Sequence, residues 1–283
     1  MKKDRIKYLL LFPIIAYSLL LIILPLIYIF FISFMKSDSY GGIIYTFNVS
    51  NYIEIFNMVY IKVFLKSFVI ATIATFICIL ISYPFTYFIS QKKGYVKNVL
   101  ITLVMIPFLT NSLIRTYGWI ILLRKHGLIN ETLLSLGLIK NPFNLMYNNF
   151  SIIIGMVYTL LPFMILPLYS SMEKINPKVI DAASDLGSSK IKTFFEIIIP
   201  YTKTGLFNGI IMVFIPCLGY FFISDLLGGG KLMILGNLIK NQFLTARNWP
   251  FGASISIAML IVSYILVKIY KHLGGNMDDL GGM

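Results

Sequence analysis

Charged residues are scarce in this sequence, and so are the residue types on which most metal and disulfide sites depend. Only 12% of the 283 residues are charged, whereas soluble domains carry about 25%. The two cysteines lie inside apolar runs, so they indicate neither a disulfide framework nor a metal site. The two histidines both lie in predicted loops, where we expect no catalytic or metal-binding role. The phosphate-binding pattern G-x-x-x-x-G-K-[ST] does not occur. We therefore expect no metal site, no cofactor and no enzymatic activity in this chain.

Hydrophobic residues are abundant instead, and they gather in long runs. They make up 58% of the chain, with a mean hydropathy of +0.84. A helix needs about 20 apolar residues to cross a bilayer, and prolines interrupt most of the runs, which is typical of bent helices. The sequence therefore predicts an all-α, polytopic membrane protein with six transmembrane helices. The six runs cover approximately residues 8–35, 63–90, 99–123, 150–172, 197–227 and 251–270.

The net charge of +13 comes largely from basic residues in the short segments that flank these runs. This distribution is typical of a membrane-topology signal, so we expect no nucleic-acid partner. With the N-terminus in the cytoplasm, more than half of the 24 Lys and Arg residues lie on the cytoplasmic side. We therefore expect both termini to be cytoplasmic. The C-terminal residues 274–283 are expected to form a disordered tail.

One polar segment, residues 176–200, separates the fourth and fifth runs and predicts two short helices with a sharp turn between them. Asn176 and Pro177 are typical of a helix start. Gly187 is typical of the residue after a helix end, because that position often needs a positive φ. One of the two serines that follow can cap the second helix. By spacing alone, an ordinary amphipathic cytoplasmic loop explains the segment as well as a docking element does.

The same segment resembles the EAA loop of ABC-transporter permeases, whose pattern is E-A-A, three residues, G, nine residues and I-x-L-P. This chain has DAASDLG, nine residues and IIIP, with Asp181 in place of the usual Glu and Ile199 in place of Leu. In that family the loop forms a cytoplasmic coupling helix that docks on the ATPase subunit. The residues that the resemblance implies for coupling are Asp181, Ala182, Ala183, Asp185 and Gly187.

Longer strings extend the resemblance over most of the chain. PFLTNSLIRTYGW, SDLLGG and WPFG, which begin at Pro107, Ser224 and Trp249, look like parts of the permeases of spermidine/putrescine (polyamine) importers. The resemblance implies a type I ABC importer permease fold in one domain over residues 1–283, with core helices at about 60–272. It implies the B-type permease subunit, in a bacterial cytoplasmic membrane. The implied partners are a second homologous permease, an ATP-binding subunit dimer, an extracellular or periplasmic polyamine-binding protein, polyamine and membrane lipid.

A polyamine needs carboxylates and aromatic faces, so such residues near the spans are candidates for the substrate pathway. Asp225, expected at the outer end of the fifth helix, is the main candidate, although it can instead cap a turn or pair with a lysine. Arg115 would repel a polyamine, so we expect it to pair with a carboxylate or a partner subunit. Glu173 is expected to form a salt bridge at the ATPase contact or at an exit. The other pathway candidates are Tyr220, Phe221, Phe222, Asn111, Tyr117 and Trp119, although aromatic residues also form ordinary interface belts.

Two alternatives stay open from the sequence. An ABC permease for another solute, such as ferric ion, thiosulfate or an aminophosphonate, would keep the same architecture. A secondary transporter would need no coupling loop and often contains an internal repeat, of which this sequence has no clear sign. The ligand that the partner binding protein holds distinguishes a permease for another solute from a polyamine permease. The need for a co-expressed ATPase distinguishes an ABC permease from a secondary transporter.

Overall fold

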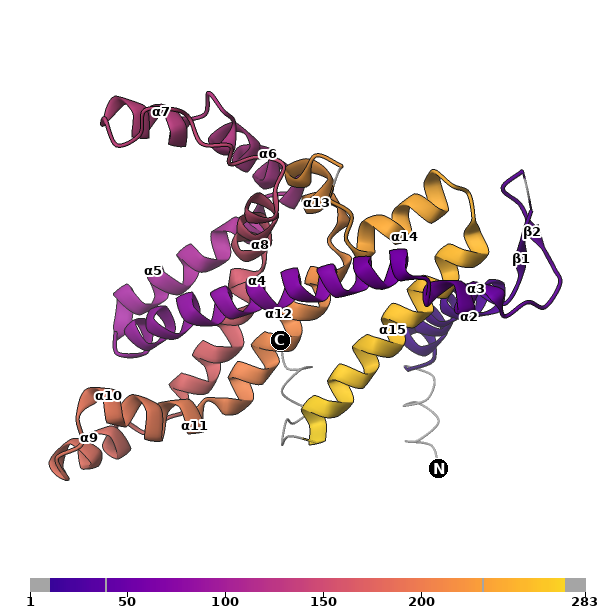
Figure 1. The fold of residues 1–283 in the computed structure, drawn as a ribbon. Coiled ribbons are helices and arrows are strands. Elements are labelled where there is room, and N and C mark those ends of the chain that lie inside the picture. The colour runs from indigo at the N-terminus through magenta and orange to yellow at the C-terminus, as the bar shows by residue number, and fades with distance from the viewer. Residues whose placement is uncertain (1–10, 39, 231, 273–283) are drawn as a thin grey trace, which may run out of the picture. The chain divides into compact units, whose positions relative to one another are not determined.

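The computed structural model describes residues 11–38, 40–230 and 232–272, and nearly all of its regular structure is helical (Figure 1). The predicted basic N-terminal head, residues 1–7, and the predicted tail, residues 274–283, lie outside these residues.

The contacts between residues divide the chain into two compact units. The first holds residues 1–62 and 238–262, and the second holds residues 63–237 and 263–283. The expectation of a single transmembrane domain over the whole chain stays a prediction.

The first unit contains the first apolar helix and a short hairpin. The chain is helical from Leu11 to Ile32. Beyond it, Asn51 donates from its amide nitrogen to the carbonyl oxygens of Ser33 (3.0 Å) and Met35 (2.8 Å), which fixes the following helix against the end of the first. The elements of this unit are η1 (Leu19–Ile23), α2 (Leu24–Ile32), β1 (Lys36–Ser37), the antiparallel β2 (Ile43–Ile44), α3 (Ser50–Ile55), most of α14 (Leu235–Leu244) and the first part of α15 (Trp249–His272).

The second unit contains the helices that position the candidate sites. They are most of α4 (Met58–Ser90), α5 (Gly94–Met105), η2 (Ile106–Leu109), α6 (Ser112–Leu123), α7 (Leu128–Ser135), α8 (Asn149–Glu173), α9 (Pro177–Asp185), α10 (Lys190–Thr193), η3 (Phe194–Ile198), α11 (Ile199–Tyr201), α12 (Lys203–Gly219), α13 (Phe221–Gly228) and the end of α15.

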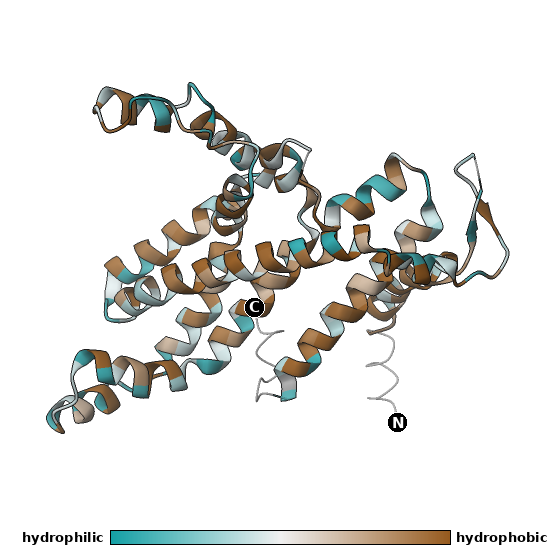
Figure 2. Ribbon diagram, in the orientation of Figure 1, coloured by the Kyte–Doolittle hydropathy of each residue, from teal (hydrophilic) through white to brown (hydrophobic). Residues whose placement is uncertain are grey.

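Four helices in the described part of the chain are long and apolar enough to cross a membrane: Leu11–Ile32, Met58–Ser90, Asn149–Glu173 and Trp249–Tyr270. Two further pairs of helices pass the same test together but are bent, and the total is six when each bent pair counts as one span. Figure 2 shows the apolar residues along these helices. Counted in this way, the described residues contain the six predicted spans.

The third predicted span is not one straight helix, which corrects the continuous run expected over residues 99–123. The helices on either side of the break, Gly94–Leu109 and Ser112–Ser135, meet at 94°. Thr110 is extended, with φ −101° and ψ 145°, and Asn111 caps α6 by accepting a hydrogen bond from the Leu113 N–H (2.8 Å). A cap makes Asn111 the start of a new helix, a local signal that hydropathy alone does not detect.

The fifth predicted run, residues 197–227, is interrupted twice. The helices on either side of Thr202, Lys190–Tyr201 and Lys203–Gly219, meet at 69°, and a second break follows Gly219. α12 ends at Gly219, because Tyr220 leaves the helical region with ψ 68°. The backbone is crowded here: a Cβ at Gly236 would lie 2.5 Å from the Gly219 carbonyl oxygen. Asp225, expected at the outer end of the fifth helix, instead lies on the separate short helix α13.

α8 and α12 lie side by side and pack closely (Figure 1). Two glycines of α12 make the approach possible. A Cβ at Gly205 would collide with the carbonyl oxygen of Pro167, and one at Gly209 would lie 2.5 Å from the sulfur of Met164. In the most apolar 18-residue stretch of α8, 67% is buried, whereas 0% is buried in the corresponding stretch of the Leu11–Ile32 helix. α8 is therefore a central helix of its unit.

We expect Gly205→Ala to destabilise the chain by about 1–3 kcal/mol, because the added methyl group meets backbone that cannot move aside cheaply. Gly118→Ala in α6 is the matched control, because no atom of the described residues lies within 4 Å of the position of its Cβ, and alanine is the better helix former. Cys78 and Cys217 are buried and free, so a thiol-reactive dye reports thermal unfolding of the full chain in detergent. Equal unfolding temperatures for the two variants would contradict the close packing of α8 and α12.

Candidate functional site

The predicted coupling segment, residues 176–200, lies between α8 and α12 and begins as the sequence predicts. The Asn176 side chain accepts a hydrogen bond from the Lys178 N–H (3.1 Å), and Pro177 is the first residue of α9. Ser189 starts α10 in the same way, by accepting from the Lys192 N–H (3.3 Å). Local side-chain caps therefore fix both helix starts.

The turn between the two helices is a Schellman motif centred on Gly187. Gly187 has φ +80°. Its N–H donates to the Ser184 carbonyl (2.9 Å), and the Ser188 N–H donates to the Ala183 carbonyl (2.9 Å). These two bonds satisfy carbonyl groups that a helix end otherwise leaves unpaired. The predicted role of Gly187 as the residue after a helix end is confirmed.

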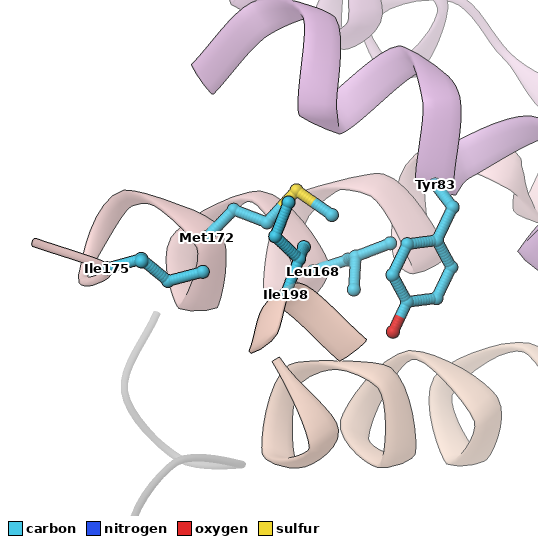
Figure 3. Close-up of a cluster of buried hydrophobic side chains, with 5 residues drawn as sticks. All are labelled: Tyr83, Leu168, Met172, Ile175 and Ile198. Carbon is cyan, nitrogen blue, oxygen red and sulfur yellow. The ribbon is translucent and has the colours of Figure 1, made fainter. Parts of the chain in front are cut away.

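A cluster of buried side chains attaches the coupling segment to the apolar helices (Figure 3). Tyr83 of α4 packs with Leu168 and Met172 of α8, with Ile175 and with Ile198 of η3. The Tyr83 hydroxyl also lies 3.1 Å from the Thr202 hydroxyl, within hydrogen-bond distance. Displacement of the segment must therefore strain or move the ends of α4 and α8, because the cluster is packed on both sides.

The exposed face of α9 carries most of the residues predicted to couple to an ATPase. Asp181, Ala182 and Asp185 are exposed, and so is Leu186 just beyond them, at 90%. Ala183 is buried within the chain. Of the two alanines, only Ala182 is thus open to the close approach of a partner backbone.

A cavity of about 470 Å³ lies between α9 and the connection from α4 to α5. Its lining includes Lys92, Lys93 and Lys97 together with Glu173 and Asp181. Lys97 and Glu173 form an ion pair with each other, so the partner of Glu173 in this structure comes from the same chain. The sequence offered no signal for this pairing across 76 positions.

The aromatic and acidic candidates come together at the start of α13. The rings of Tyr220 and Phe222 lie 5.3 Å apart, and those of Phe221 and Phe222 lie 6.2 Å apart. Asp225 is half-buried one turn further on. Its Oδ1 accepts a hydrogen bond of 2.5 Å from the amide nitrogen of Asn237.

Sequence reasoning missed Asn237 as a member of this group. The Asn237 side chain also donates to the Phe221 carbonyl (3.1 Å) and accepts from the Ile234 N–H (3.3 Å). It is buried, with 4% of its surface exposed, and a buried amide needs partners. The sequence signal that could have identified Asn237 is an asparagine among apolar residues, twelve positions after Asp225.

The remaining candidates lie on or next to α6, which packs against α13 and α8. Asn111 caps the helix, and Tyr117 is 55% exposed. Trp119 packs edge-on against Tyr158 of α8, with ring centres 5.5 Å apart. The guanidinium carbon of Arg115 lies 5.8 Å from the centre of the same Tyr158 ring. The structure thus gives Asn111 and Trp119 local structural roles and leaves Tyr117 exposed.

A chain with up to six spans and a capped, partly exposed helical segment between two of them has the form of a transport permease. The chain belongs to the family of binding-protein-dependent transport system inner membrane components, whose family model matches residues 82–278. It is therefore a transport subunit of the inner membrane.

Among curated proteins, the chain is similar to the spermidine/putrescine transport system permease protein PotB of Escherichia coli (strain K12). The two are 43% identical over 257 residues, which cover 91% of this chain and 94% of that protein. PotB of Haemophilus influenzae is 38% identical, over 91% of this chain and 90% of that protein.

Two crystal structures show the same fold. A bacterial ABC transporter involved in the import of alginate matches with a TM-score of 0.74 and 16% identity, over 96% of both chains. A bacterial alginate ABC transporter in complex with a pentasaccharide-bound periplasmic protein matches with a TM-score of 0.78 and 14% identity, over 96% of this chain and 94% of that chain. The expected ABC importer permease fold is therefore confirmed.

Gly187→Val should loosen the turn of the coupling segment. Among the residues that the structure describes, no atom lies within 4 Å of the position of a Cβ there, so the cost comes from the positive φ, about 1–2 kcal/mol. Amide hydrogen exchange of the full chain should then accelerate about tenfold at Ser188. Gly187→Asn is the control, because asparagine tolerates this conformation better and should change the exchange less. Identical exchange in both variants would contradict the conformation of Gly187.

Proposed function

We propose that this chain is a permease subunit of an ATP-driven importer of polyamines of the spermidine/putrescine class, and forms half of the translocation pathway. The observation that carries this proposal is the 43% identity to the Escherichia coli PotB permease over nearly the whole of both chains. The relative at 38% identity carries the same name. Import of another solute, such as ferric ion, thiosulfate or an aminophosphonate, is the second candidate, because the fold alone does not select the substrate.

The proposed assembly contains a second homologous permease, two copies of an ATP-binding subunit and an extracellular or periplasmic polyamine-binding protein. The family description names dependence on a binding protein, and one structural neighbour is in complex with a periplasmic protein. This chain lies in a bacterial cytoplasmic membrane with both termini in the cytoplasm. ATP binds to the ATPase subunits, and this chain holds no ATPase site and needs no cofactor.

The proposed substrate path passes the group formed by Tyr220, Phe221, Phe222 and Asp225. Polyamines are flexible chains with ammonium groups, and each ammonium gains about 0.5–2 kcal/mol over an aromatic face. A carboxylate next to apolar spans is costly to keep, which favours a functional role for Asp225. Binding along this path is weak, because tight binding would prevent release.

The proposed coupling step uses the exposed face of α9. Closure of the ATPase dimer moves α9, and the cluster around Tyr83 and Ile198 passes this movement to α4 and α8. The segment also leads into α12 through a 69° bend at Thr202, so both of its ends lead into spans. The coupling residues act by position and shape, since none of them needs to take part in chemistry.

Asp225→Asn tests the pathway in a reconstituted complex with loaded binding protein. The asparagine keeps an oxygen that can accept the hydrogen bond from Asn237 but loses the charge. We expect polyamine uptake to fall about tenfold, equal to about 1.4 kcal/mol, while ATP turnover stays within about twofold. Asp225→Glu, which keeps the charge, should retain more uptake than Asp225→Asn. Normal uptake by Asp225→Asn would exclude a role for this charge.

Asp181→Lys tests the coupling role. A reversed charge on the exposed face of α9 should lower binding-protein-stimulated ATP turnover and co-purification of the ATPase about tenfold. Asp181→Glu should retain both, because it restores the residue usual in the family pattern. Uptake that needs no ATPase subunit would instead point to a secondary transporter, and a binding protein that holds no polyamine would point to another solute.

A further inference from the structure

The first half of the third, bent span, α5, is not fixed by a buried core. None of its residues is buried. Its far end is held through η2, because Phe108 packs edge-on against Phe163 of α8, with ring centres 4.9 Å apart. The end that begins at Gly94 therefore depends on individual side-chain contacts for its position.

Lys97, in the first turn of α5, makes these contacts. Its ammonium group forms an ion pair with Glu173, the last residue of α8. The same ammonium nitrogen lies 5.6 Å from the centre of the Tyr169 ring. Tyr169 and Glu173 are four residues apart and share one face of α8. One lysine of α5 is thus held at two neighbouring points on α8.

Both charges of the ion pair lie at the helix end that disfavours them. Lys97 is a cation near the N-terminus of α5, and Glu173 is an anion at the C-terminus of α8. The helix dipole favours the opposite sign at each of these ends. Each charge therefore works against its own helix, and the attraction between the two residues offsets this cost only while α5 and α8 stay together.

The contact point on α8 is also the place where the coupling segment is attached. Met172 and Ile175, on either side of Glu173, belong to the buried cluster that holds the segment (Figure 3). Asp181 of α9 lines the same cavity as Lys97 and Glu173. A displacement of α9 that moves the end of α8 therefore also moves the carboxylate to which α5 is paired.

Movement of α5 reaches the proposed substrate path through the bend of the third span. The two parts of this span, Gly94–Leu109 and Ser112–Ser135, meet at 94° across a connection of two residues. Asn111 in this connection is fixed as the cap of α6. α6 packs against α13, which carries Phe221, Phe222 and Asp225. So short a connection leaves α6 little freedom to stay in place when α5 moves.

We propose that Lys97 is a positioning residue for transport, which couples the third span to the coupling segment through Glu173 and Tyr169. The proposal rests on the proposed function, because it requires an ATPase that moves α9. In this division of roles, α9 receives the movement and the Lys97–Glu173 pair passes it to α5 and α6.

The first experiment asks whether the pair holds α5, and it needs neither substrate nor ATP. Spin labels at Tyr95→Cys and Lys174→Cys, two exposed positions beside the pair, report the distance between α5 and the end of α8 in the full chain. Lys97→Met should broaden the distance distribution about twofold, because a helix without buried residues is then tied at one end only. Lys93→Met is the matched control, because Lys93 is exposed and lines the same cavity, and it should leave the distribution unchanged.

A charge swap separates the pair from other effects of the substitutions. Glu173→Gln should broaden the distribution as Lys97→Met does, and Lys97→Glu combined with Glu173→Lys should narrow it again, because opposite charges face each other once more. An unchanged distribution in Lys97→Met, equal broadening in Lys93→Met, or no narrowing in the swapped variant would overturn the proposal.

The second experiment measures transport by the reconstituted complex with loaded binding protein. Lys97→Met should lower uptake per ATP hydrolysed about threefold, the modest effect expected of a pair whose side chains are partly exposed. Co-purification of the ATPase should stay unchanged, because α9 keeps its exposed face, and the swapped variant should recover uptake. Unchanged uptake per ATP, or loss of the ATPase from the complex, would overturn the proposal. Uptake without an ATPase would contradict the proposed function instead, whereas the label distances would still decide whether Lys97 holds α5.

Discussion

The close packing of α8 against α12 is the constraint on which the second unit depends. Gly205 and Gly209 let the backbones approach until a single added methyl group would collide. The candidate coupling segment is the connection between these two helices, so its two ends are held by a pair that cannot separate easily. A movement applied to α9 is then passed to two packed helices together, since close-packed interiors do not absorb displacement gradually.

Within the coupling segment, hydrogen bonds between neighbouring residues make the two helices and their turn rigid, and residues far away in the sequence hold the segment against the apolar helices. Asn176, Gly187 and Ser189 fix the two helices and the turn through caps and a positive φ. The cluster around Tyr83 then holds the segment against α4 and α8. A segment that is stiff in itself and packed on one side leaves its other face, with Asp181 and Ala182, available for a partner.

The features that the sequence predicts correctly are those with local or periodic causes. Hydropathy located the spans, and cap residues located the helix starts and the turn at Gly187. The breaks after Leu109 and Gly219 escaped prediction, because an apolar run does not reveal the direction in which a helix points. The contacts of Asp225 with Asn237 and of Glu173 with Lys97 also escaped, since both depend on how distant segments pack. The break after Gly219 is also the reason why Asp225 lies on the separate short helix α13.

Polar groups next to the apolar spans of this chain mostly have partners of their own. Asn208 accepts a hydrogen bond from the Tyr270 hydroxyl, and Asn237 has three partners around α13. Ser82, Tyr169 and Arg115 are different. The Ser82 and Tyr169 hydroxyls and two nitrogens of Arg115 are buried without a hydrogen-bond partner among the described residues. A buried polar group without a hydrogen-bond partner costs free energy, so these positions are where the packing of the unit is least favourable.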